Sequence, residues 1–229
     1  MFQWLRRTSQ YGCPPIRYAD GVDKRILRGM QSRQLVLDRA MNIASVEGLE
    51  SLSVRRLAVE LDVSKSGVFA LFGSKEELQL ATVRAAIEVF AAKVVRPARR
   101  TPAGIRRVRA LGESWLRYTR QPVFDGGCFF TSAAAEFDAR PGRVRDTIAS
   151  ARQDWQTLYA ATTSEAQELG EIAADVDPAD LAFELDALAR VAAEDAVLFD
   201  DDSRYDRVAR IMLARLRAVA TDPALLHEA

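Results

Sequence analysis

Residues 53–72 read Ser-Val-Arg-Arg-Leu-Ala-Val-Glu-Leu-Asp-Val-Ser-Lys-Ser-Gly-Val-Phe-Ala-Leu-Phe. Apolar residues at helical spacing from Val54 to Leu61 predict a short amphipathic helix, which Ser53 is placed to cap. A second short helix is expected after Ser64, which can cap it in the same way. Two short helices joined by a tight turn are typical of the helix-turn-helix, whose second helix enters the DNA major groove. An αα-hairpin in an ordinary helical core is the alternative interpretation.

The flanking sequence extends this pattern to a three-helix unit. A preceding helix carries an apolar face that includes Leu37 and Ala44, and it is expected to stop at Gly48. Ser74 and Glu77 have the spacing of a capping box, which predicts a further helix immediately after the pair. The second helix of the pair is expected to turn its large apolar residues mostly toward its neighbours: Val68, Phe69, Leu71 and Phe72.

Charge is unevenly distributed along a chain whose net charge is zero. Residues 1–100 hold 17 Lys and Arg against 10 Asp and Glu, which leaves 15 against 22 for the rest. A basic N-terminal part favours a polyanion such as DNA as partner, and it is the part that holds the helix-turn-helix. Random scatter of charge is the alternative.

The segment from Arg33 to Leu80 resembles the DNA-binding domain of the tetracycline-repressor (TetR) family. The residues that carry the resemblance are Ile43-Ala44, Gly48-Leu49, Ser53 to Ala58, Val63-Ser64-Lys65, Phe69, Phe72 and Ser74 to Leu78. The resemblance implies an all-α protein, with an N-terminal three-helix helix-turn-helix domain followed by a larger helical domain that binds a ligand and dimerises.

DNA contacts follow from the motif and the resemblance together. Lys65, Ser66 and Gly67 are expected to face base edges in the major groove. The residues expected to hold phosphates are Arg33, Ser53, Arg55 and Lys75. The other residues expected at the DNA surface are Val54, Ser64 and Phe69. Arg56 either joins the phosphate contacts or pairs with Glu60 one helical turn later. Phe69 and Leu71 stand where the family commonly has tyrosine and histidine, so those two phosphate contacts are not expected here.

Helical periodicity continues through the rest of the chain. We expect residues 1–30 to be a flexible or loosely helical tail, residues 31–78 to be the DNA-binding domain and residues 79–229 to be the ligand-binding and dimerisation domain. Lys24, Arg25 and Arg28 suggest either a basic arm on DNA or a solvated extension. A long helix after the capping box is expected to end before Pro97, and Thr101-Pro102 to open the next. The remaining helices are expected near 128–137, 144–169, 178–199 and 205–220.

Catalytic, metal and cofactor chemistry finds little support in the sequence. The chain has one histidine, His227, so no histidine metal cluster or triad can form. Gly126-Gly127 is too short for a phosphate-binding loop, and the acidic run at Asp200–Asp202 is interpreted as a solvated helix end rather than a cation site. We therefore expect no enzyme, no metal and no cofactor. Two cysteines, Cys13 and Cys128, and no apolar run that could span a membrane predict a cytoplasmic protein.

A cluster of aromatic residues suggests where a ligand binds. Residues expected to line an apolar cavity, unless they are ordinary core, are Trp115, Tyr118, Phe129, Phe130, Trp155 and Tyr159. The predicted function is a homodimeric, sequence-specific regulator of transcription, a repressor that an apolar small molecule releases from double-stranded DNA. The alternative is a helical small-molecule-binding protein or enzyme with a degenerate helix-turn-helix. Leu188 and Leu216 are expected in the dimer interface. The sequence does not specify the operator, the effector, the regulated genes or the sign of regulation.

Overall fold

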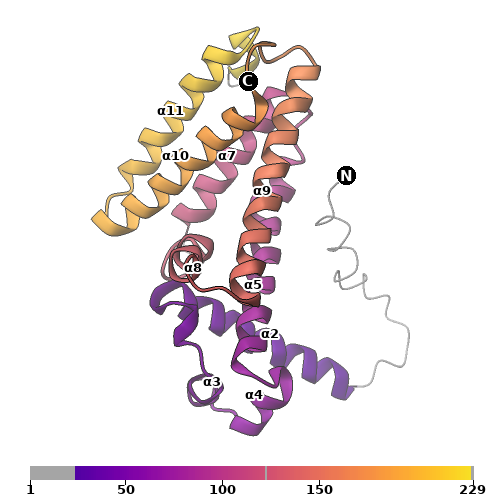
Figure 1. The fold of residues 1–229 in the computed structure, drawn as a ribbon, viewed down its shortest axis with the longest axis vertical. Coiled ribbons are helices and arrows are strands. Elements are labelled where there is room, and N and C mark those ends of the chain that lie inside the picture. The colour runs from indigo at the N-terminus through magenta and orange to yellow at the C-terminus, as the bar shows by residue number, and fades with distance from the viewer. Residues whose placement is uncertain (1–23, 122, 228–229) are drawn as a thin grey trace.

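A computed structural model describes residues 24–121 and 123–227 of the chain, with side chains from residue 31 onward (Figure 1). Most of these residues are helical, and no strand occurs among them beyond one isolated bridge between Ile172 and Ala220. Proposals made for Cys13 and for the side chains of Lys24, Arg25 and Arg28 lie outside the described residues. The all-α class predicted from periodicity is confirmed.

The predicted three-helix unit is present at the N-terminal end. Its elements are α2 (Lys24–Glu47), the 3₁₀ turn η1 (Leu49–Ser51), α3 (Val54–Glu60) and α4 (Lys65–Phe72). The predicted caps form, because the Ser53 hydroxyl accepts from the Arg56 N–H and the Ser64 hydroxyl accepts from the Gly67 N–H. α2 begins at Lys24, within the segment expected to be a tail.

α5 (Lys75–Phe90) starts at the capping box, where the Ser74 hydroxyl accepts from the Glu77 N–H. The prediction that this helix ends before Pro97 is wrong. It continues through a π turn (η2, Ala91–Val95) into α6 (Arg96–Ala98). In the π turn the Arg96 N–H donates to the Ala91 carbonyl, which places Pro97 in the first turn of a new helical segment. A proline is tolerated there because its missing N–H is not needed.

The C-terminal part is built from long helices. They are α7 (Ile105–Arg120), α8 (Phe129–Phe137), α9 (Arg143–Glu168), α10 (Pro178–Phe199), α11 (Ser203–Val219) and the 3₁₀ turn η3 (Pro223–Leu226). The predicted start of α7 at Thr101-Pro102 is wrong. Gly104, at φ 114°, precedes the helix, and the Glu171 carboxylate accepts from the Ile105 N–H at 2.7 Å, which satisfies the first turn.

The helices are arranged along one axis (Figure 1). α3 and α4 form one end, α10 and α11 lie beside each other at the opposite end, and α8 lies between the two regions. α5 and α9 connect the two ends, and one continuous apolar core extends from the N-terminal unit through the C-terminal helices. Because α5 packs on α2 and on α9, the boundary that we placed at residue 78 stays a prediction.

α8 and the loop before it are bonded directly to the N-terminal unit. The Glu136 carboxylate accepts from the backbone N–H groups of Leu49 (2.6 Å) and Glu50 (3.0 Å). A Cβ atom at Gly48 would lie 2.9 Å from that carboxylate, so only glycine permits the approach without a shift. The Gly126 N–H also donates to the Ser45 hydroxyl at 3.0 Å. The two parts of the chain are therefore joined by hydrogen bonds as well as by apolar packing.

Candidate DNA-binding surface and internal cavity

The outer face of α4 carries polar residues in its first turn and one large apolar side chain after them. Val68 and Phe72 are 1% and 7% exposed and anchor the helix to the core, whereas Lys65, Ser66 and Gly67 are exposed as expected. Phe69 is 53% exposed, so the expectation that its ring packs against a neighbouring helix is wrong. Its side chain lies on the outer face because the core positions of this short helix are filled by Val68 and Phe72.

The basic residues near α4 fall into two groups. Arg55 and Lys65 are exposed and have no ion-pair partner among the described residues, and the Arg33 guanidinium lies 5.2 Å from the Phe72 ring centroid. Lys75, in contrast, donates to the Glu50 carboxylate at 2.5 Å. A phosphate contact by Lys75 would have to replace this ion pair, whereas contacts by Arg55 or Lys65 would not have to break one.

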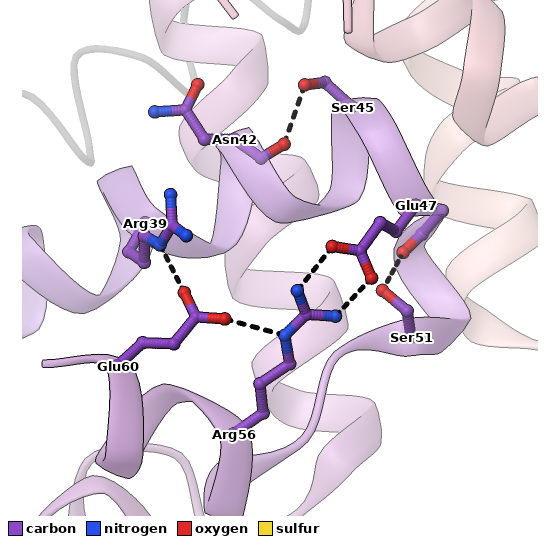
Figure 2. A network of polar contacts seen from close by, with 8 residues as sticks. Arg39, Asn42, Ser45, Glu47, Ser51, Arg56 and Glu60 are labelled. Carbon is purple, nitrogen blue, oxygen red and sulfur yellow. Dashed lines mark hydrogen bonds and ion pairs between the residues drawn. The ribbon is translucent and has the colours of Figure 1, made fainter. Parts of the chain in front are cut away.

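Arg56 is committed to an ion-pair network inside the domain (Figure 2). Its guanidinium donates to both oxygens of Glu47 and, through Nε, to Glu60 at 2.8 Å, and Arg39 also donates to Glu60. Hydrogen bonds from Arg56 hold the pKa of the Glu47 and Glu60 carboxyls below their usual range. Of the two roles considered for Arg56, the structure supports the pairing with Glu60 and adds Glu47. The network ties α3 to α2.

The C-terminal part contains a cavity of about 420 Å³, partly open to solvent, between α5, α7, α8, α9 and α10. Of the six aromatic residues expected there, Trp115, Phe130 and Trp155 line it. Tyr118, Phe129 and Tyr159 do not. Phe129 and Tyr159 are fully buried, and the Tyr159 hydroxyl donates to the Val108 carbonyl at 3.3 Å. Tyr118 is also buried, so all three side chains belong to the core, which was the alternative to a place in the cavity wall.

Phe90 organises the aromatic wall and was missed from the sequence. Its ring packs edge-to-face against Trp155, with centroids 5.1 Å apart, and against Phe130 and Trp115 at 6.0 and 6.3 Å. Phe90 is the last residue of α5, the helix that begins beside α4. Its position at the end of an apolar helical face was the available signal.

A buried carboxylate also faces the cavity and was missed. Asp186 is 2% exposed and accepts from Trp155 Nε1 at 2.7 Å and from Arg190 Nε at 3.0 Å. Its i, i+4 spacing to Arg190 was the only signal in the sequence. Further charged residues line the cavity: Asp138, Arg145, Arg152, Asp154 and Glu194. The lining of the cavity thus combines aromatic rings with charged groups.

No group of three or more potential metal ligands occurs in the described part of the chain. The Asp201 carboxylate accepts from the Ser203 N–H and pairs with Arg204, as a helix start would require. No helix from residue 24 to 227 is long and apolar enough to cross a membrane.

Comparison with known proteins links both parts of the chain to one family. Residues 36–82 match the model of bacterial regulatory proteins of the tetR family, and residues 104–212 match the tetracyclin repressor-like C-terminal domain. None of the curated proteins compared matches by sequence.

Solved structures share the fold. A TetR transcriptional regulator from Chloroflexus aurantiacus J-10-FL is 20% identical, with a TM-score of 0.79 over 84% of this chain and 98% of that one. A TetR-family regulator from Streptomyces coelicolor is 23% identical, with a TM-score of 0.71 over 87% and 97%. AibR, solved with isovaleryl coenzyme A and operator DNA, is 19% identical, with a TM-score of 0.62 over 82% and 97%. With both domain models matched in the family's order, the chain belongs to the TetR family of bacterial transcriptional regulators.

Proposed function

We propose that this regulator is a homodimeric repressor that binds operator DNA through α4 and is released by a small molecule in the cavity. The observation that carries the proposal is that α8 contacts both the cavity and the N-terminal unit. One face of this helix lines the cavity with Thr131 and Ala134, while Glu136 accepts hydrogen bonds from the backbone of the DNA-binding domain. A molecule that moves α8 therefore acts directly on the part that contacts DNA. We further propose a cytoplasmic protein without enzymatic activity.

The exposed surface of α10 and α11 supports the dimer. Large apolar side chains are exposed there: Phe183, Val191, Val197, Leu198, Phe199 and Ile211. Exposed large apolar side chains gathered on two neighbouring helices favour an interface there. Of the two residues that we expected in the interface, Leu216 is 1% exposed within the core and cannot contact a partner, whereas Leu188 is only partly buried. We therefore assign the interface to the outward-facing residues of the same helices.

The lining of the cavity defines the effector in outline. The aromatic rings of Phe90, Trp115 and Trp155 suit an apolar body, and the charged residues of the lining offer partners to a polar end. AibR contains isovaleryl coenzyme A, and a regulator from Saccharomonospora viridis with the same fold contains choline. Fold relatives thus accept very different molecules. We propose an amphipathic effector rather than a purely apolar one.

One experiment tests operator binding and effector release together. Selection from random double-stranded DNA should yield a two-fold symmetric site, and a thermal-shift screen of small amphipathic molecules should yield a compound that stabilises the protein. That compound is expected to lower affinity for the selected site. A compound that binds in the cavity without changing operator affinity would contradict release. Failure to select any preferred sequence would favour the alternative, a ligand-binding protein or enzyme with a degenerate helix-turn-helix.

Lys65→Ala is expected to weaken operator binding by about 1–3 kcal/mol and to relax the preference at one base pair per half-site, if Lys65 contacts a base edge. Fluorescence anisotropy with the selected site and its single-base variants measures both effects. Lys75→Ala is the matched control, since the Lys75 ammonium is paired with Glu50. The assignment of α4 fails if Lys65→Ala changes neither affinity nor sequence preference.

Glu136→Gln is expected to reduce the effect of the effector on operator affinity while leaving effector binding intact. A glutamine accepts only one of the two backbone N–H groups and places an amide N–H₂ against the other, which costs about 1–3 kcal/mol. The measurement is the ratio of operator Kd values with and without the compound from the screen. An unchanged ratio would show that the Glu136 contact does not carry the coupling.

A further inference from the structure

The exposed ring of Phe69 has no structural role in the described chain that would explain its place. It is more than half exposed, while the residues that hold α4 to the core, Val68 and Phe72, are buried. An α-helix advances 100° per residue, so Phe69 lies on the same face as Lys65 and Ser66, one turn farther along. A large apolar group is therefore presented to whatever the polar first turn of α4 contacts.

The chemistry around Phe69 restricts the contacting surface. No acidic residue occurs between Val63 and Lys75, Lys65 is exposed one turn before Phe69 on α4, and Arg55 is exposed on the preceding helix α3. This surface suits a polyanion. A phenyl ring has no hydrogen-bond donor, however, so it gains nothing from a phosphate oxygen.

Within the major groove, one base feature is apolar. The C5-methyl group of thymine projects into the groove, and apolar side chains, phenylalanine among them, contact it. We propose that Phe69 is a specificity-determining residue that reads a thymine methyl group in each operator half-site, beside the base edge that Lys65 contacts. Ala70, also exposed on α4, adds a second small apolar surface to this face. The inference rests on the proposed function as an operator-binding dimer.

The test removes the methyl group alone. In the operator selected with the wild-type protein, each thymidine is replaced in turn by deoxyuridine, which keeps every hydrogen-bonding group of the base. Replacement at the contacted position is expected to weaken wild-type binding about fourfold in one half-site and about fifteenfold in both, the effect of losing one buried methyl group per site. Anisotropy at fixed salt measures each Kd.

The Phe69→Ala protein should bind the thymidine and deoxyuridine operators equally. Val59→Ala, on α3, is the matched control, because Val59 is 75% exposed and apolar yet lies off this face; it should keep the wild-type preference for thymidine. Phe69→Leu retains an apolar contact and should keep part of the preference, which covers the case in which the alanine variant does not fold.

Three results would overturn the inference. Wild-type affinity that is the same for every deoxyuridine operator would show that no methyl group is read. Discrimination that survives in both Phe69 variants at full strength would assign the methyl contact to another residue. Failure to select any operator would remove operator binding and the inference together, whereas a selected operator that is insensitive to deoxyuridine removes only the inference.

Discussion

Replacing both Phe183 and Val191 by glutamate is expected to convert a dimer into a monomer and to lower operator affinity by about 10²- to 10⁴-fold. Both side chains are more than half exposed on α10, so the single chain tolerates the change, whereas a dimer interface would have to bury four charges. A monomer contacts one half-site, and it loses the gain in effective concentration that two linked binding domains provide.

Sedimentation at micromolar concentration and anisotropy on the full operator measure the two effects. Leu35→Glu is the control for oligomeric state, because Leu35 is a 54% exposed apolar residue on α2, in the N-terminal unit. Circular dichroism should report the same helical content for all variants. A double variant that remains dimeric would place the interface on another surface.

Asp186→Ala is expected to lower the free energy of unfolding by about 3 kcal/mol. The substitution removes the acceptor of Trp155 Nε1 and of Arg190 Nε, leaving a buried N–H unpaired and a partly buried guanidinium without its counter-charge. The cost is at the lower end for a buried pair because the Arg190 side chain is 26% exposed and keeps some contact with water.

Urea denaturation followed by circular dichroism gives the comparison with wild type. Glu194→Ala is the matched control, since Glu194 also lines the cavity but is exposed; its effect should stay within about 0.5 kcal/mol. A loss below about 1 kcal/mol for Asp186→Ala would mean that water replaces the carboxylate in the cavity. Trp155 fluorescence should change in the Asp186 variant, because its indole N–H loses its partner.

The DNA-binding domain was predictable because its signals are local. The caps at Ser53, Ser64 and Ser74 and the apolar spacing of α3 depend on residues within one or two helical turns. The exposed position of Phe69 was not predictable from the sequence, because the number of core contacts available to a short helix depends on the helices around it. The same holds for Lys75, whose partner Glu50 lies 25 residues earlier in the chain.

The cavity was predictable only in part. Concentrated aromatic residues indicated its location, but whether a ring lines the cavity or fills the core depends on how five helices pack. Tyr159 is the example, since it lies on the same helix as Trp155 and one turn farther along, yet points to Val108 on α7. Asp186 was not predictable as a cavity residue, because its partner Trp155 comes from another helix 31 residues away.

The contact between Glu136 and the backbone of η1 bears on domain swaps between regulators of this family. The Glu136 carboxylate oxygens accept from two main-chain N–H groups, so the contact does not depend on which side chain residue 50 carries. It requires glycine at position 48 and excludes proline at positions 49 and 50, which would lack the donated N–H. A chimera that carries the first three helices of another family member should therefore have that protein's DNA sequence preference and this protein's effector response, provided that position 48 is glycine and positions 49 and 50 are not proline.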